Sequence, residues 1–219
     1  DCVWSWDDEA QQYYRHMFYA HEPDLNLANP RVRDEMYRVM SFWLRLGVSG
    51  FRVDAVPYMI ERARAADPRE DGFWLLDDMR EFVALRRPEA VLMGEVDVPP
   101  EDYRNYFGRG DRLTLLLNFW LNNHLYLALA RGGAEPIARA LAEQPVPPEY
   151  AQYALWLRNH DELDLGRLSD DERDEVMRCF APDADMHAYG RGIRRRLPPM
   201  LDGDERRLAM VHALLFSLP

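Results

Sequence analysis

The chain has 219 residues, of which 47% are hydrophobic and 12% aromatic. This composition favours a folded protein with a sizeable core and argues against disorder. The formal net charge is −11, whereas a protein that binds nucleic acid or an anionic membrane would need a basic patch, so we expect neither partner. No apolar stretch reaches the length of a membrane span and no signal peptide is recognisable, so we expect a cytoplasmic location.

Cys2 and Cys179 are too few for a disulfide framework and lack metal-ligand spacing, so we expect two plain thiols. The chain begins without an initiator Met and stops just after an apolar helical run. We therefore expect it to be a piece of a longer protein.

Residues 29–47 carry the clearest helix signal. Asn29 suits the N-cap, Pro30 the first helical position and Gly47 the stop. Apolar residues recur at helical spacing and predict one core-facing side: Val32, Met36, Val39, Met40 and Trp43.

Strands and helices then alternate along the chain. We expect strands at 50–56, 90–96, 113–119 and 153–161, and helices at 73–87, 119–131, 135–144, 169–179 and 203–217. Alternation of this kind predicts βαβ units and a parallel sheet.

Three of the four predicted strands end in charged residues, namely Asp54, Glu95 and the pair His160 and Asp161. In a (β/α)8 barrel that edge carries the catalytic groups, and an open doubly wound sheet follows a similar rule. The sequence has no GxGxxG or GxxxxGK[ST] segment, which argues against the nucleotide-binding form of the open sheet.

Carboxylates at separate strand ends fit the cleavage of a glycosidic bond. Retention of configuration needs one carboxylate as nucleophile and a second carboxyl about 5–5.5 Å away as proton donor. Arg52 lies two residues before Asp54, on the same face of a strand, where a guanidinium would keep the aspartate ionised and oriented. The apolar run before Glu95 would favour its protonated form, as a general acid requires.

Each of these positions also has a structural explanation. Arg52 and Asp54 could form an ion pair at a strand end, and Glu95 could be an ordinary loop acid. The segment 159–161 could cap a helix. The run of arginines at 194–196 is expected to be a solvated and salt-bridged helix face.

Three segments, taken together and in order, resemble signature segments of the α-amylase superfamily, glycoside hydrolase family thirteen. They are GFRVDAV at 50–56, MGEV at 93–96 and LRNHDE at 157–162. The resemblance implies a (β/α)8 barrel and a retaining enzyme that acts on α-glucosidic bonds. It implies Asp54 as nucleophile, Glu95 as acid/base and Asp161 as transition-state stabiliser, with Arg52 and His160 binding the substrate.

Longer stretches, at 12–61, 157–177 and 192–219, are similar to the trehalose synthase branch of that family. The resemblance implies a partial barrel with roughly strands four to seven at 29–219, preceded at 1–28 by the tail of an inserted domain. The loop after Glu95, VDVPPEDYRNYFG, departs from that branch, which leaves isomerisation and hydrolysis both open.

The family also implies a Ca²⁺ site beside the nucleophile segment. By resemblance its ligands here would be the carbonyl oxygens of Tyr58 and Met59 and the carboxylate of Glu61, all hard oxygen donors. Glu61 could instead be a first-turn helix acid favoured by the helix dipole. No organic cofactor is expected.

The sequence therefore predicts double displacement on maltose, trehalose or other α-linked glucosides, and foremost the isomerisation of maltose to trehalose. An α-glucosidase or α-amylase, and a non-catalytic carbohydrate-binding barrel, remain alternatives. A partial barrel exposes sheet edges and apolar surface, so we expect self-association of this piece and no activity on its own.

Overall fold

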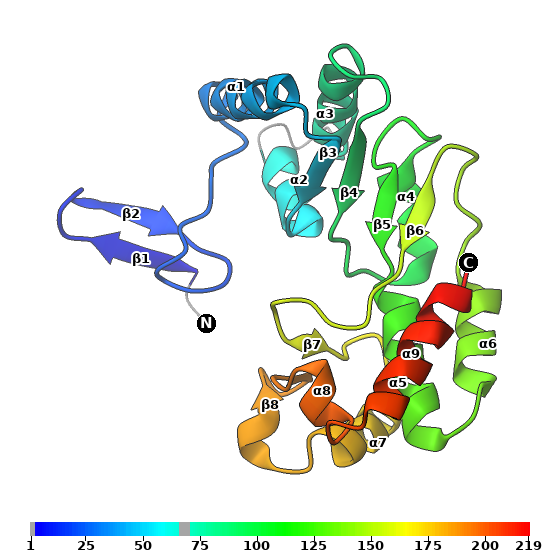
Figure 1. The fold of residues 1–219 in the computed structure, drawn as a ribbon. Helices are drawn as coiled ribbons and strands as arrows, with labels where there is room; N and C mark the ends of the chain where they lie inside the picture. Colours follow the sequence, from blue (N-terminus) through cyan, green and yellow to red (C-terminus); the bar gives the residue numbers. More distant parts are fainter. Residues whose placement is uncertain (1–2, 66–70) are drawn as a thin grey trace. The chain divides into compact units, whose positions relative to one another are not determined.

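The computed structural model describes residues 3–65 and 71–219 (Figure 1), so Cys2 lies outside the described residues. The chain divides into two compact units, Asp1–Ala90 and Val91–Pro219. The predicted boundary between residues 28 and 29 stays a prediction.

Unit 1 begins with a hairpin that the sequence did not predict. Strands β1 (Trp4–Asp7) and β2 (Gln12–Arg15) pair antiparallel, with Trp4 opposite Arg15. Arg15, the last residue of β2, forms an ion pair with Asp24 at 2.5 Å, which ties the segment after the hairpin to β2.

Helix α1 (Pro30–Leu46) has the ends that the sequence predicted. The Asn29 side chain accepts a hydrogen bond from the Arg31 N–H at 3.0 Å, and Gly47 closes the helix in the left-handed region with φ 101°. The prediction of its buried face was wrong in part. Met40 is buried, but Val39 and Trp43 are 41% and 46% exposed.

The rest of unit 1 contains β3 (Gly50–Val53), α2 (Val56–Arg64) and α3 (Trp74–Ala84). The strand ends three residues earlier than predicted, because the chain turns at Asp54 and Ala55 into α2, which was not predicted. Val53, Val56 and Ile60 are buried, so the short apolar run serves both the strand and the helix.

Unit 2 contains a parallel sheet of β4 (Val91–Gly94), β5 (Leu115–Leu117) and β6 (Gln152–Ala154). The helical segments between β4 and β5 are η1 (Pro100–Asp102) and α4 (Tyr103–Phe107), and those between β5 and β6 are α5 (Phe119–Arg131) and α6 (Glu135–Glu143). The predicted alternation and the parallel sheet are confirmed for this unit. The strand predicted at 153–161 is wrong in its extent, because β6 ends at Ala154 and His160 and Asp161 lie in the irregular segment that follows it.

After β6 the chain forms a second, antiparallel sheet in the order β7–β9–β8, which was not predicted. Its strands are only two residues long, too short to leave an alternating pattern. The elements are β7 (Leu163–Asp164), α7 (Asp170–Phe180), η2 (Ala184–Met186), β8 (His187–Ala188), β9 (Gly192–Ile193), α8 (Leu197–Met200) and α9 (Glu205–Ser217).

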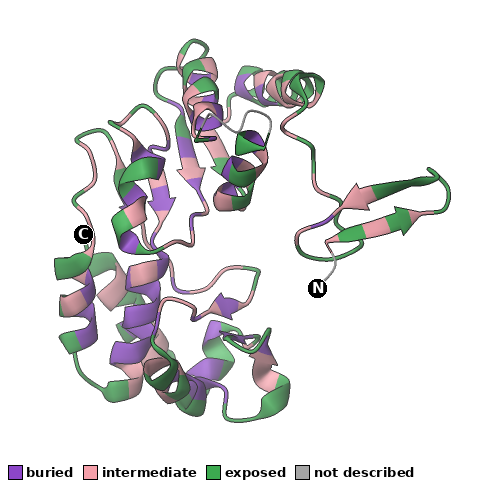
Figure 2. Cartoon of the chain, turned by 180° about the vertical axis from the view of Figure 1, so that it is seen from behind, coloured by how far each residue is buried: buried purple, intermediate pink, exposed green. Residues whose placement is uncertain are grey.

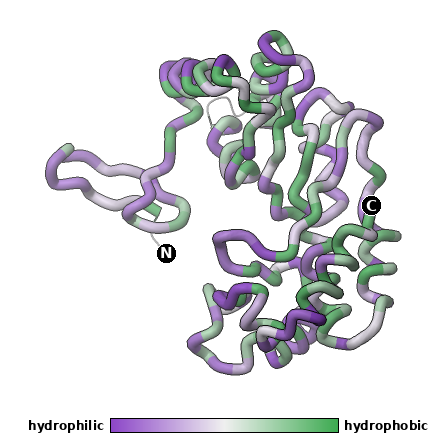
Figure 3. Tube along the Cα trace, viewed as in Figure 1, coloured by the Kyte–Doolittle hydropathy of each residue, from purple (hydrophilic) through white to green (hydrophobic). Residues whose placement is uncertain are grey.

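Helix α5 is the centre of the unit 2 core. Most residues of α5 are buried, namely Phe119 and every residue from Leu121 to Ala128 (Figure 2), as expected of a helix enclosed by neighbouring elements. Leu125 and Tyr126 of α5 belong to the same apolar cluster as Phe180 and Val211 from α7 and α9, and the apolar character of β5 is visible in Figure 3. The Tyr126 hydroxyl donates to the Leu157 carbonyl at 2.8 Å, which anchors the chain just before the predicted site segment 159–161.

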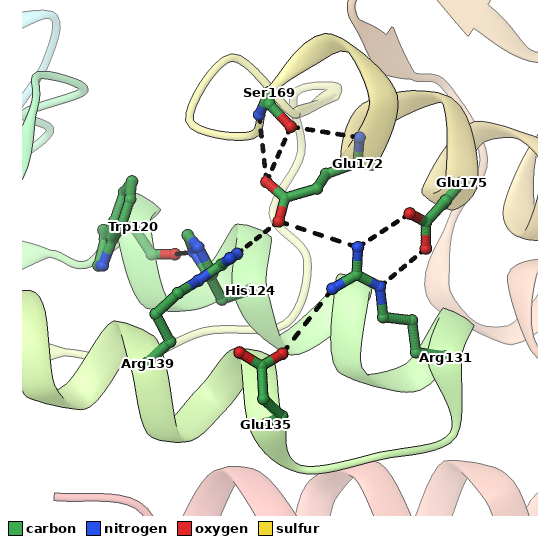
Figure 4. Close-up of polar contacts among 8 residues, drawn as sticks. All are labelled: Trp120, His124, Arg131, Glu135, Arg139, Ser169, Glu172 and Glu175. Atoms are coloured by element: carbon green, nitrogen blue, oxygen red, sulfur yellow. Dashed lines mark hydrogen bonds and ion pairs between the residues drawn. The ribbon is translucent and has the colours of Figure 1, made fainter.

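Helices α5, α6 and α7 are also joined by charged side chains (Figure 4). Arg131 donates to both carboxylate oxygens of Glu175 at 2.8 Å, and Arg139 donates to Glu172 at 2.6 Å. Glu172 and Ser169 form a capping box at the start of α7. This network fixes the helices that follow β5 and precede α8.

Candidate active site

Asp54 follows directly after β3 in unit 1. Ala55 has φ 45°, a left-handed conformation that is costly for a residue with a side chain, and it turns the chain sharply from β3 into α2. Strain at this point is consistent with a functional site. The turn leaves the Asp54 side chain 70% exposed.

Arg52 and Asp54 form the contact that their spacing predicted. Arg52 Nη1 donates to Asp54 Oδ1 at 2.5 Å, and the Arg52 side chain is 30% exposed. The largely covered Arg52 side chain therefore holds one oxygen of an accessible carboxylate, the arrangement expected of an oriented nucleophile.

Glu95 is the first residue after β4 in unit 2 and is half-buried. The residue before it, Gly94, is buried, and a Cβ there would lie 2.4 Å from the Leu113 side chain and 3.1 Å from that of Val96. Only glycine fits without a shift of these neighbours, so the packing under the strand end fixes the point from which Glu95 leaves the sheet.

His160 and Asp161 lie in the turn that follows β6. His160 Nε2 is 3.3 Å from Asp161 Oδ2, and the two side chains are 73% and 51% exposed. The Asn159 side chain accepts a hydrogen bond from the Asp161 N–H at 3.1 Å and closes the turn. The next helix is α7 at Asp170, so the explanation that this segment caps a helix is wrong.

Two arginines hold the backbone of this turn. Arg196 donates to the carbonyls of Asn159 and His160 at 2.5 and 2.6 Å, and to that of Asp161 at 3.3 Å. Arg158 also donates to the carbonyls of Asn159 and Asp161. All three carbonyls of the segment 159–161 thus accept bonds from guanidinium groups.

Arg158 also bonds the opposite segment of the chain, donating to the carbonyls of Ile193 and Arg195 at 3.3 and 3.0 Å. Burial, and secondarily the neighbouring Arg196, lowers the pKa of Arg158 from its ordinary value. The carbonyl dipoles offset the cost of placing two cations side by side.

The prediction that residues 194–196 form a helix face was wrong, because they connect β9 to α8. Sequence reasoning therefore missed Arg158 and Arg196 as supports of the site. The LRNHDE segment placed Arg158 beside it, but no sequence signal marked Arg196.

A cleft of about 410 Å³ lies beside this turn within unit 2. Its lining combines apolar and basic side chains: Trp156, Leu157, Arg158, Asn159, Arg196, Leu197, Pro198, His212 and Leu215. Neither Glu95 nor Asp161 belongs to the lining, so the cleft neighbours the candidate site without containing its carboxylates.

The predicted calcium ligands all lie on α2. Tyr58 and Met59 occupy its first half and the exposed Glu61 follows, so two backbone carbonyls and a carboxylate come from one helix. Their chemistry suits Ca²⁺, which requires six to eight oxygens, so more ligands must come from other residues. Among residues 3–65 and 71–219, no group of three or more His, Cys, Asp or Glu side chains is arranged to hold a metal ion.

None of the helices in the described part of the chain combines the length and the apolar character that a membrane crossing requires.

Comparison with known proteins defines the class. The solved structure of trehalulose synthase MutB from Pseudomonas mesoacidophila MX-45 matches with a TM-score of 0.52 and 26% identity, over 73% of this chain and 32% of that one. The fold is part of a (β/α)8 barrel. A profile of the alpha-amylase catalytic domain matches residues 1–179, and the chain belongs to that family.

Two curated relatives extend over nearly the whole chain. Trehalose synthase from Thermus thermophilus is 41% identical over 217 residues, and trehalose synthase/amylase TreS from Mycobacterium tuberculosis (strain ATCC 25618 / H37Rv) is 40% identical over 221 residues. These matches cover 98% and 99% of this chain. The chain spans only 22% and 37% of the lengths of these relatives.

Proposed function

We propose that the protein containing this chain is a retaining α-glucosidic enzyme that isomerises maltose to trehalose. The observation that carries the proposal is the identity of about 40% to trehalose synthases over 98–99% of the chain. The proposed substrates are maltose, trehalose or related α-linked glucosides. A Ca²⁺ ion held in part by Tyr58, Met59 and Glu61 belongs to the proposal.

In the proposed mechanism Asp54 attacks the anomeric carbon while Glu95 protonates the departing glycosidic oxygen, which gives a covalent β-glucosyl enzyme. Asp161 stabilises the positive charge that develops in the oxocarbenium-like transition state. Arg52 keeps Asp54 ionised and aimed, and His160 binds a sugar hydroxyl.

The second half of the cycle decides between isomerisation and hydrolysis. If the released glucose stays in the site and attacks through its anomeric hydroxyl, Glu95 removes the proton from that hydroxyl and trehalose forms. If water attacks instead, the product is glucose. The outcome depends on how well the site excludes water.

Hydrolysis is the second candidate, because the name of the Mycobacterium tuberculosis relative includes amylase. The test is to incubate the full-length protein with maltose and follow the sugars by NMR. Trehalose as main product supports the proposal, whereas glucose alone would establish the hydrolase. No turnover of any α-glucoside would favour the non-catalytic carbohydrate-binding barrel.

A further inference from the structure

A partly buried ion pair joins two segments that carry proposed catalytic carboxylates. Asp97 lies two residues after Glu95, in the loop that follows β4, and Arg167 lies six residues after Asp161. Arg167 Nε is 3.0 Å from Asp97 Oδ1, and the two side chains are only 21% and 24% exposed. The contact therefore connects the two segments within unit 2.

The Arg167 end of the pair is anchored from several directions. Asn123 on α5 accepts a hydrogen bond from the Arg167 N–H at 3.1 Å and donates to the Asp164 carbonyl at 2.8 Å. Arg191 Nε and Nη2 both lie 2.9 Å from Asp164 Oδ2, and the Gly166 N–H donates to Asp164 Oδ1 at 2.7 Å. Arg167 is thus presented to Asp97 from a fixed backbone.

Stability alone does not account for this pair. The cost of removing two charges from water often equals or exceeds their attraction, so a well-packed apolar pair would stabilise the fold at least as well. Burial raises the pKa of Asp97 to about 6, and the charged groups facing it are Arg167, Asp164 and Arg191. Asp97 Oδ1 and Arg167 Nε are both buried and lie 3.0 Å apart without hydrogen-bond geometry, so the contact is electrostatic. What this attraction adds at such a cost is a link between two particular groups.

We infer that Asp97 and Arg167 are positioning residues that hold the segment of Glu95 at a fixed spacing from the segment that follows Asp161. The inference rests on the proposed function, because the proposed function makes Glu95 the proton donor and Asp161 the stabilising carboxylate. Asp97 lies in the loop whose sequence departs from the trehalose synthase branch, whereas Arg167 lies in the stretch 157–177, which is similar to that branch.

The test compares Asp97→Asn, Arg167→Gln and the double variant in the full-length protein. Each single change is expected to lower kcat on maltose about tenfold, since small misplacements of catalytic groups are costly, with KM changed less than about threefold. The double variant should be no slower than the slower single variant, because the two residues act as one unit. Arg167→Lys, which keeps the charge, should recover part of the loss.

The matched control is Asp170→Asn, which breaks an exposed ion pair with Arg173 on α7 (2.6 Å, Asp170 side chain 90% exposed). It should leave kcat unchanged. Unchanged kcat in Asp97→Asn and Arg167→Gln, or losses that multiply in the double variant, would overturn the inference.

Amide hydrogen exchange gives a readout that does not depend on activity. Exchange at residues 95–99 and 163–168 should be faster in Asp97→Asn and in Arg167→Gln, with the Asp170→Asn control unchanged. Unchanged exchange in both variants would overturn the inference whatever the activity. If exchange is faster in the variants while the wild-type protein turns over no α-glucoside, the link between the two segments is supported and the proposed function is wrong. The failure of the inference and the failure of the proposed function can thus be told apart.

Discussion

The exposure of Asp54 favours one of the two explanations of its pairing with Arg52. An ion pair whose carboxylate is 70% exposed is worth roughly 0–1 kcal/mol, too little to explain a strained left-handed residue directly after it. Orientation of an accessible carboxylate accounts for both features. The sequence predicted this contact from the two-residue spacing alone, because that spacing places side chains on one face of a strand.

Glu95→Gln provides a test of the proton donor. With maltose, whose leaving group needs protonation, the change should lower kcat by about 10²–10⁴-fold. With α-glucosyl fluoride, whose leaving group needs no proton, the formation of the glucosyl enzyme should be nearly as fast as in the wild type. Single-turnover kinetics on the two substrates measures the difference, and equal losses on both would contradict the role of Glu95.

Asp97 makes the folding stability depend on pH. Burial raises its folded-state pKa from 3.8 to about 6, so its contribution to stability is present below about pH 4 and is lost as the pH rises through 6. Relative to Asp97→Asn, the wild type should therefore lose up to about 3 kcal/mol between pH 4 and pH 7. Unfolding midpoints of the two proteins across this range measure the effect, and parallel pH curves would contradict it. At neutral pH the charged Asp97 thus makes the folded protein less stable than a neutral side chain would, while it forms the ion pair with Arg167.

At the scale of elements, the turn after β6 depends on its two arginines. Arg196→Met should lower kcat about 100-fold, because the His160 carbonyl loses its guanidinium partner and those of Asn159 and Asp161 keep only Arg158, which loosens the turn that carries Asp161. Arg194→Met, on the same connection and exposed, is the control and should retain wild-type kcat. Steady-state kinetics on both folded variants makes the comparison, and equal rates would show that the contacts have no role in positioning.

The elements that the sequence predicted well have strong local signals. Helix α1 has its Asn, Pro and Gly at the expected ends, and strands β4 and β5 of unit 2 are short apolar runs. Helix α2 was missed because the apolar residues before and after Asp54 read as one strand, and only the left-handed Ala55 separates them. The β7–β9–β8 sheet and the Arg196 contacts depend on pairings between distant residues, which no local pattern reports.

At the scale of the molecule, the 219-residue chain alone should self-associate and be inactive. It spans about a fifth to two fifths of its relatives, and large apolar side chains such as Trp6, Phe42 and Trp43 are 46–49% exposed. Sedimentation velocity and a maltose assay test this expectation. A monodisperse and active monomer of this length would contradict it.

In the proposed mechanism Asp54 forms a covalent bond to glucose. Incubation of the full-length protein with 5-fluoro-α-glucosyl fluoride should trap the glucosyl enzyme, since the ring fluorine destabilises the positive charge of the transition state that releases it. Tryptic mapping should then place the adduct on the peptide Val53–Arg62, at Asp54, with no adduct on this peptide in Asp54→Asn. An adduct on another peptide, or a wild-type enzyme that turns over the reagent with inversion, would contradict the mechanism.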